Sequence, residues 1–329
     1  MSQTRSTFAR GEFSSLVSSF RQTGFVVHEP LPGVVQICRP DNDAGERLRL
    51  LISVGVHGDE TAPIEMMALL LEELARNPQA LALDLMVAVG NIDAIAQSKR
   101  FIDVDLNRLF TPPAPTGRTQ FQGSREALRA DQLMDVTARF FEGRPHKWHL
   151  DLHTAIRASF YPAFAIVPGS PNDLFLRWLG SAGIQAAVLN PDATVTFSAY
   201  TCRYLGAISC TAELGRIGEL GKNDLTQFSQ TQHALDALLR AGVAPDLLQS
   251  TLKPRLFRVA QELIKRSEAF HLTFDGHTQN FTEFAPHTLI ARDGDISYRV
   301  GDQPEYVLFP NPSVRVGLRA GLMAVSIPG

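Results

Sequence analysis

The chain of 329 residues is 44% hydrophobic and 20% charged, which is the composition of an ordinary globular protein. Its formal net charge of −3, without a basic tract, indicates neither a nucleic-acid partner nor a membrane partner. The N-terminus lacks the apolar core of a signal peptide, and the apolar runs are far shorter than the roughly 20 residues of a membrane-spanning helix. Three cysteines without a CxxC pair indicate reduced thiols, so we expect a cytoplasmic location.

The first 45 residues predict little regular structure. Residues 1–30 resemble a mixed leader with one short helix at 13–20. Residues 33–38 alternate weakly, as an edge strand does, and a turn follows at 40–43.

The stretch from Leu48 to Glu60 predicts a strand, a sharp turn and the start of a helix. Its apolar, β-branched first half is typical of a buried strand, and Gly55 and Gly58 indicate the turn. Pro63 is tolerated in the first turn of the helix, whose apolar stripe comprises Ile64, Met67, Ala68 and Leu71.

His57 and Glu60 lie in that turn, where an α/β sheet presents its strand ends and binds ligands. A histidine and a carboxylate with this spacing can close on one zinc ion, because zinc accepts both imidazole nitrogen and carboxylate oxygen. The alternative is a surface pair that only caps the helix. The motif by itself favours neither interpretation.

The segment after the next predicted strand, at 85–89, lies on the same edge of the sheet. Asp103, Asp105 and Asn107 have the spacing of a calcium loop, but Arg108 occupies the position at which that loop requires glycine. We therefore reject a calcium site.

Arg100 and Arg108 in this segment are suited to binding a carboxylate or a carbonyl, because guanidinium is permanently charged and can donate two parallel hydrogen bonds. The alternative is that both arginines pair with Asp103 and Asp105 in a purely structural network.

A helix at 124–141, N-capped by its first serine, precedes a strand at 147–153. The alternation of this strand places His149, Asp151 and His153 on one face. His153, at the strand end, can supply a third metal ligand, and His149 is the competing candidate further back in the sheet. Asp151 can accept a hydrogen bond from a ligand imidazole and fix its tautomer.

Further strands are predicted at 164–167, 185–189 and 207–212, with Glu213 at the end of the last one. A buried carboxylate costs free energy unless it meets a cation or takes part in chemistry. Glu213 is therefore either a catalytic group or half of a structural ion pair. A helix at 224–241 follows.

Residues 242–254 read as a linker, and the remainder of the chain is rich in short β runs separated by turns. We expect these strands at 269–274, 288–291, 296–300, 306–309 and 314–318. The expected organisation is a catalytic domain at 1–245 and a β-rich domain at 246–329.

These candidates fit one reaction class, the zinc-dependent hydrolysis of an amide. Two imidazoles and a carboxylate can hold zinc, Glu213 can carry a proton from water to a leaving amine, and arginines can stabilise negative charge. A non-catalytic zinc-binding protein is the rival hypothesis, but it gives no reason for Glu213 and the arginines to gather at one edge.

Four motifs together resemble the succinylglutamate desuccinylase/aspartoacylase group of the zinc carboxypeptidase-like superfamily: Gly55-Val-His-Gly-Asp-Glu60, Asp103-Val-Asp-Leu-Asn-Arg108, Asp151-Leu-His153 and Glu213-Leu-Gly215. Four others are similar to the desuccinylase branch of that group: Asp151-Leu-His-Thr-Ala-Ile-Arg157, Gly221-Lys-Asn-Asp-Leu225, Phe309-Pro-Asn-Pro312 and Gly317-Leu-Arg-Ala-Gly321.

The resemblance implies a zinc carboxypeptidase-like α/β/α sandwich with a mixed sheet, plus a small C-terminal β domain that helps to wall the active site. It implies one zinc ion per subunit, held by His57, Glu60 and His153, with Asp151 behind a ligand. The implied catalytic residues are Glu213 and Arg100, and the implied substrate-binding residues are Asn107, Arg108 and Arg203.

The implied reaction is the hydrolysis of a small molecule, N-succinyl-L-glutamate, to succinate and L-glutamate in arginine catabolism. The alternatives are an aspartoacylase-like activity and another N-acyl-amino-acid hydrolase or carboxypeptidase. A homo-oligomer is compatible with the sequence.

Overall fold

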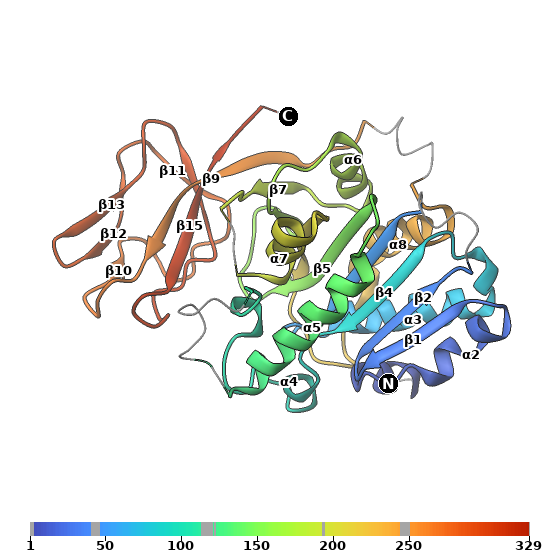
Figure 1. Cartoon of the computed structure of the whole chain (residues 1–329). Helices are drawn as coiled ribbons and strands as arrows, with labels where there is room; N and C mark the ends of the chain where they lie inside the picture. Colours follow the sequence, from blue (N-terminus) through green and yellow to red (C-terminus); the bar gives the residue numbers. More distant parts are fainter. Residues whose placement is uncertain are drawn as a thin grey trace.

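A mixed sheet of twelve strands forms the centre of the computed structural model, which describes residues 3–40, 47–112, 121, 123–192, 195–243 and 251–328 (Figure 1). The strand order is β1-β2-β4-β3-β5-β8-β6-β7-β9-β15-β14-β11. In chain order these strands are β1 (Val26–Leu31), β2 (Val34–Cys38), β3 (Arg49–Val54), β4 (Asp84–Val89), β5 (Lys147–Ala155), β6 (Phe164–Val167), β7 (Ala186–Leu189), β8 (Ile208–Arg216), β9 (Arg255–Ile264), β11 (Thr282–Phe284), β14 (Glu305–Leu308) and β15 (Arg319–Ser326).

The inner strands β4, β3, β5 and β8 run parallel to one another, so that their carboxyl ends meet at one edge of the sheet. All six residues of β4 are buried, as expected for a parallel strand covered on both faces. Strand β6 runs antiparallel to β8, which makes the sheet mixed.

Helices cover both faces of the sheet, and Figure 1 shows α5 (Arg125–Phe141) and α7 (Phe197–Leu205) together on one face. Their apolar residues form one core with the sheet. A second, larger core on the other face takes residues from α1 (Gln3–Ala9), α2 (Ser14–Gln22), α3 (Ala62–Arg76), α6 (Asp173–Ser181) and α8 (Ser229–Ala241). The predicted α/β/α sandwich with a mixed sheet is therefore confirmed.

The remaining helices are short and lie in connections: η1 (Pro78–Ala80), α4 (Ile92–Ala96), η2 (Leu106–Arg108) and η4 (Leu225–Phe228). In the described part of the chain, no helix has the length and apolarity needed to cross a membrane.

The C-terminal β region continues the large sheet. Strand β9 pairs in parallel with β7 and antiparallel with β15, and a three-stranded sheet of β10 (His271–Leu272), β12 (Leu289–Asp293) and β13 (Ile296–Arg299) packs beside it. Phe164 and Val188 of the first half share a core with Phe257, Leu308 and Leu322 of this region. The predicted small C-terminal β unit is confirmed.

Several local predictions were wrong. The expected edge strand at 33–38 is the second strand, because β1, inside the expected leader, pairs antiparallel on its outer side. Residues 314–318 precede a strand instead of forming one, and β15 begins at Arg319. The single helix expected at 224–241 is split into η4 and α8.

Other predictions fall on parts of the chain outside the described residues. These are most of the turn at 40–43, most of the linker at 242–254, and the boundary between residues 245 and 246.

Candidate metal and catalytic site

The loop between β3 and α3 carries His57 and Glu60 and is packed tightly against a second loop. The N–H of Gly58 donates to the carbonyl oxygen of Arg100 at 3.1 Å. A Cβ atom at Gly58 would lie 2.3 Å from the carbonyl carbon of Ala94, so only glycine allows this approach. The predicted turn thus joins the candidate metal ligands to the segment that carries the arginines.

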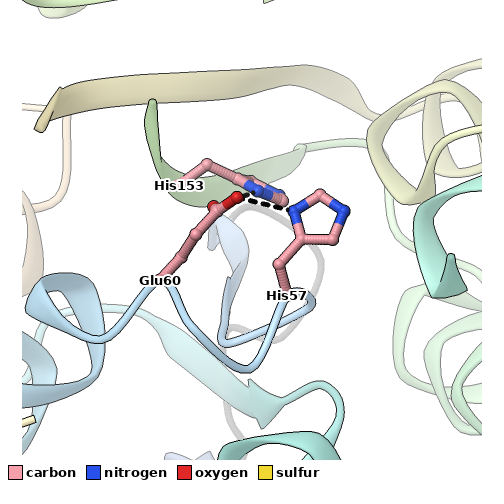
Figure 2. A group of neighbouring side chains, drawn as sticks. All are labelled: His57, Glu60 and His153. Atoms are coloured by element: carbon pink, nitrogen blue, oxygen red, sulfur yellow. Dashed lines mark hydrogen bonds and ion pairs between the residues drawn. The ribbon is translucent and has the colours of Figure 1, made fainter. Parts of the chain in front are cut away.

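Three buried side chains converge at the ends of β3 and β5: His57, Glu60 and His153 (Figure 2). His57 Nδ1 lies 2.8 Å from Glu60 Oε1, and His153 Nδ1 lies 2.8 Å from Glu60 Oε2. One ligand atom from each residue lies within 4.8 Å of the others, an arrangement that could hold a metal ion.

The second nitrogen of each imidazole faces an aspartate. His57 Nε2 lies 3.0 Å from Asp105 Oδ1, and His153 Nε2 lies 2.9 Å from Asp151 Oδ2. A carboxylate at Nε2 keeps the proton there and directs the Nδ1 lone pair toward a cation. The residues therefore fit a metal ion, and the expected position of Asp151 behind a histidine is observed. The contact of Asp105 was not anticipated from the sequence.

His149, the competing third ligand, lies further back in the sheet. Its ring nitrogens lie 2.8 Å from Ser53 Oγ and 2.9 Å from Thr201 Oγ1. Burial lowers the pKa of His149 to about 4, so this imidazole is neutral and structural. The structure brings His153 to the cluster and leaves His149 in the core.

The carboxylates dominate the protonation of the cluster. Burial disfavours the charged forms of His57 and His153, but their neighbours outweigh this effect and raise the pKa of both, that of His153 strongly. Burial likewise opposes ionisation of Glu60, yet the two histidines hold its pKa well below the usual range. The surrounding carboxylates therefore favour the protonated form of both imidazoles and the ionised form of Glu60.

Glu213 lies beside this cluster because β8 pairs with β5 in a register that makes His153 and Glu213 direct neighbours. It is 9% exposed, and in the described part of the chain its side chain makes no hydrogen bond. Burial, reinforced by the charge of Glu60, raises the pKa of Glu213 to about 7. Strand β8 continues past it to Arg216, so Glu213 lies within the strand and not after it.

Arg100 contacts the cluster itself. Its Nη1 donates to Glu60 Oε1 at 2.8 Å, and its Nη2 lies 3.1 Å from His57 Nε2. Arg108 is less engaged, with Nη1 donating to the carbonyl of Asn107 at 2.9 Å and Nη2 lying 3.8 Å from Asp105. The structural network considered from the sequence therefore describes Arg108 in part, but not Arg100.

Glu126 on α5 holds the loop that carries these arginines, a role that the sequence did not indicate. Its buried carboxylate accepts hydrogen bonds from the backbone N–H groups of Ile102, Asp103 and Val104, at 2.7, 3.1 and 3.3 Å. An acidic residue in the first turn of a helix is common for electrostatic reasons alone, so no local signal distinguished it.

Asn107 is buried, and its Oδ1 accepts a hydrogen bond from the N–H of Phe197 at 2.9 Å. This bond anchors the loop at 100–110, which we call the arginine loop, to the start of α7.

The structure does not bring Arg203 to the cluster. Arg203 is exposed in the last turn of α7, and the carbonyl of Leu205 just after it accepts a hydrogen bond from Lys147 Nζ at 2.8 Å. Lys147 begins β5, whereas His153 lies six residues further on, roughly 20 Å along an extended strand. This distance argues against the substrate contact that the resemblance implied.

Two family models match the chain. The succinylglutamate desuccinylase/aspartoacylase catalytic domain matches residues 46–239, and the AstE/AspA barrel-sandwich hybrid domain matches residues 252–327.

Individual proteins give the same picture. A succinylglutamate desuccinylase of Burkholderia cenocepacia is 41% identical over 298 residues, which cover 86% of this chain and 83% of that protein. The solved succinylglutamate desuccinylase of Chromobacterium violaceum is 35% identical with a TM-score of 0.78 and covers 95% of this chain and 97% of its own. The corresponding Vibrio parahaemolyticus structure is 27% identical with a TM-score of 0.81, covering 95% of both chains.

Proposed function

Because the chain belongs to the succinylglutamate desuccinylase/aspartoacylase family, we propose that it hydrolyses N-succinyl-L-glutamate to succinate and L-glutamate. The observation that carries this proposal is the register of β5 and β8. It sets Glu213, with a pKa of about 7, beside the buried cluster of His57, Glu60 and His153. Relatives over most of the chain bear the name of this activity.

The metal in this proposal is zinc, held by His57, Glu60 and His153. Two imidazole nitrogens and one carboxylate suit zinc, which when bound supplies Lewis acidity that polarises a carbonyl and makes water more acidic. Asp105 and Asp151 orient the two imidazoles from behind.

Glu213 is the proton carrier of the reaction. Its carboxylate accepts a proton from water as the water oxygen bonds to the amide carbon, and it gives that proton to the nitrogen when the C–N bond breaks. A pKa near neutrality serves both halves of this cycle, and a bound cation would lower it, because positive charge favours the carboxylate.

Arg100 stabilises the negative charge that develops on the amide oxygen, since its guanidinium already lies against the cluster. Arg108 binds a substrate carboxylate, with Asn107 fixing the loop from which it extends. The substrate carries three carboxylates, so a site supplied with guanidinium groups matches its charge.

The proposal includes a cytoplasmic location, with which the free thiols of Cys38, Cys202 and Cys210 agree. It also includes the division of the chain into a catalytic region at 1–245 and a β-rich region at 246–329.

The test is the release of free glutamate from N-succinyl-L-glutamate, beside the release of aspartate from N-acetyl-L-aspartate. Zinc-loaded protein is compared with chelator-treated protein and with chelator-treated protein reloaded with zinc. We expect chelator-sensitive, zinc-restored glutamate release and little aspartate. A preference for N-acetyl-L-aspartate would overturn the proposed substrate. Full activity after complete removal of zinc would overturn the proposed requirement for zinc.

A further inference from the structure

The residues that follow β5 lead directly from the candidate metal site to the C-terminal β region. Arg157 lies two residues beyond the end of β5 and four beyond His153. Its Nη2 donates to the carbonyl of Pro310 at 2.7 Å, and its Nη1 donates to the carbonyls of Gly276 and Thr278. One guanidinium therefore gathers three main-chain carbonyls from two separate segments of the C-terminal region.

Asn280 connects the same segments through hydrogen bonds of its backbone and side chain. Its N–H donates to the carbonyl of Ala158 at 2.9 Å, and its own carbonyl accepts from the N–H of Phe160 at 3.1 Å. The buried side chain of Asn280 accepts from the N–H of Phe309 at 2.8 Å through Oδ1. Together, these hydrogen bonds connect the segments 157–160, 276–280 and 309–310, and we call this connected unit the joint.

The joint is also tied to the strand that carries Glu213. The N–H of Ile217, which follows β8, donates to the carbonyl of Ala155 at 3.2 Å. The joint therefore connects the C-terminal region to the ends of β5, which carries His153, and β8, which carries Glu213.

The C-terminal region brings a charged group toward the substrate-binding residues. Arg319, the first residue of β15, donates to Glu262 Oε1 at 3.3 Å. Burial, and to a lesser extent the charge of Arg108, lower the pKa of Arg319. The C-terminal region therefore holds a guanidinium group within electrostatic range of Arg108.

We propose that Arg157 is a positioning residue that seats the C-terminal β region against the metal-bearing strand ends and so sets the wall of the substrate site. This inference rests on the proposed function for its kinetic consequence but not for its structural one. The planar guanidinium can serve three carbonyls in fixed directions, whereas the compact ammonium of lysine cannot reproduce that fork. Among the described residues Arg157 has no carboxylate partner, so its hydrogen bonds to carbonyls are its main contribution.

The test uses Arg157→Met and Arg157→Lys in the full-length, zinc-loaded protein. The matched control is Arg299→Met, which removes an exposed arginine that donates to one carbonyl of the same region, that of His287, away from the joint. Hydrogen exchange is followed at the amides of Phe160, Asn280 and Phe309, with zinc content and Tm measured in parallel.

We expect at least tenfold faster exchange at these three amides in both Arg157 variants, with full zinc content and an unchanged control. With N-succinyl-L-glutamate we expect KM to rise about tenfold and kcat to fall less than threefold. If Arg157→Met folds poorly, the milder Arg157→Lys decides the question.

Unchanged hydrogen exchange in both variants would overturn the proposal that Arg157 holds the joint together. Normal kinetics in Arg157→Lys alone would show that charge, and not the fork, is what matters, and would also overturn the proposal. If the unmodified protein did not hydrolyse the substrate, the proposed function would fail, while the exchange experiment would still decide the role of Arg157.

Discussion

The metal cluster and the arginine loop at 100–110 reach the same edge of the sheet by different means. His57 and Glu60 follow β3, and His153 lies near the end of β5. These two strands are hydrogen-bonded neighbours, so the sheet itself fixes the spacing of the three side chains. The arginine loop contains only a short 3₁₀ turn and is held by groups outside it: the carboxylate of Glu126, the N–H of Phe197 and the N–H of Gly58. This difference separates metal binding from substrate binding, and the two are expected to fail independently.

The largest effect is expected on the sheet side, for Glu213→Gln. Removing the proton carrier should lower kcat by about 10³-fold, within the range for a general acid–base residue. Zinc content should stay complete because Glu213 is outside the ligand set. The measurements are steady-state kinetics and metal analysis of the same sample. A loss of zinc would show instead that Glu213 is a ligand.

Asp105→Asn and Asp151→Asn test whether these two aspartates act on the metal cluster or on the arginine loop. Each aspartate faces the second nitrogen of a ligand histidine, so each change should weaken zinc binding by about 10–100-fold. Competition with a calibrated chelator measures this affinity, and Asp135→Asn, an exposed residue paired with Arg139, is the control. If Asp105→Asn changed only KM, this aspartate would belong functionally to the arginine loop.

The pH dependence of zinc binding is expected to reveal the protonated imidazoles. The pKa values of His57 and His153 are raised without metal, and zinc requires both rings to be neutral, so binding releases protons. Affinity should therefore fall as the pH is lowered, by about tenfold per pH unit for each proton released, starting above the usual histidine range. Calorimetry in two buffers of different ionisation enthalpy counts the protons. A zinc affinity that did not weaken as the pH is lowered through the histidine range would contradict the assignment.

The smallest effect is expected on the loop side, for Glu126→Gln. An amide keeps one acceptor oxygen but loses the charge that strengthens hydrogen bonds to three backbone N–H groups. We expect kcat/KM to fall about tenfold, with zinc affinity unchanged. Glu142→Gln, an exposed change at the other end of α5, is the control. Weaker zinc binding in Glu126→Gln would mean that the two regions are coupled.

The sequence was informative where function depends on strand ends. Apolar runs followed by His57, His153 or Glu213 predicted strands and the edge that they share, because parallel strands present their carboxyl ends together. The sequence was uninformative where position depends on partners far along the chain. Glu126 contacts residues 22 to 24 positions away, and no local periodicity reports such a contact.

Arg203 shows a limit of another kind. It precedes Glu213 by ten residues, but the intervening chain leaves a helix, turns at Gly206 and enters a strand running back across the sheet. The resemblance implied that Arg203 binds substrate, but the reversal of the chain places it at the opposite end of the strand from Glu213. In the C-terminal region short strands of weak alternation gave the right class of structure, but β15 began later than the apolar pattern suggested.

The pairing of β7 with β9 has a consequence for how the protein unfolds. The backbone ladder and the shared core of Phe164, Val188 and Phe257 pass between the two halves without interruption. Separating the region up to β7 from the region that begins at β9 would expose apolar surface and an unpaired strand on both. We therefore expect neither region to stay folded without the other. Heating should consequently melt the whole molecule in one cooperative transition, with the calorimetric and van't Hoff enthalpies in agreement.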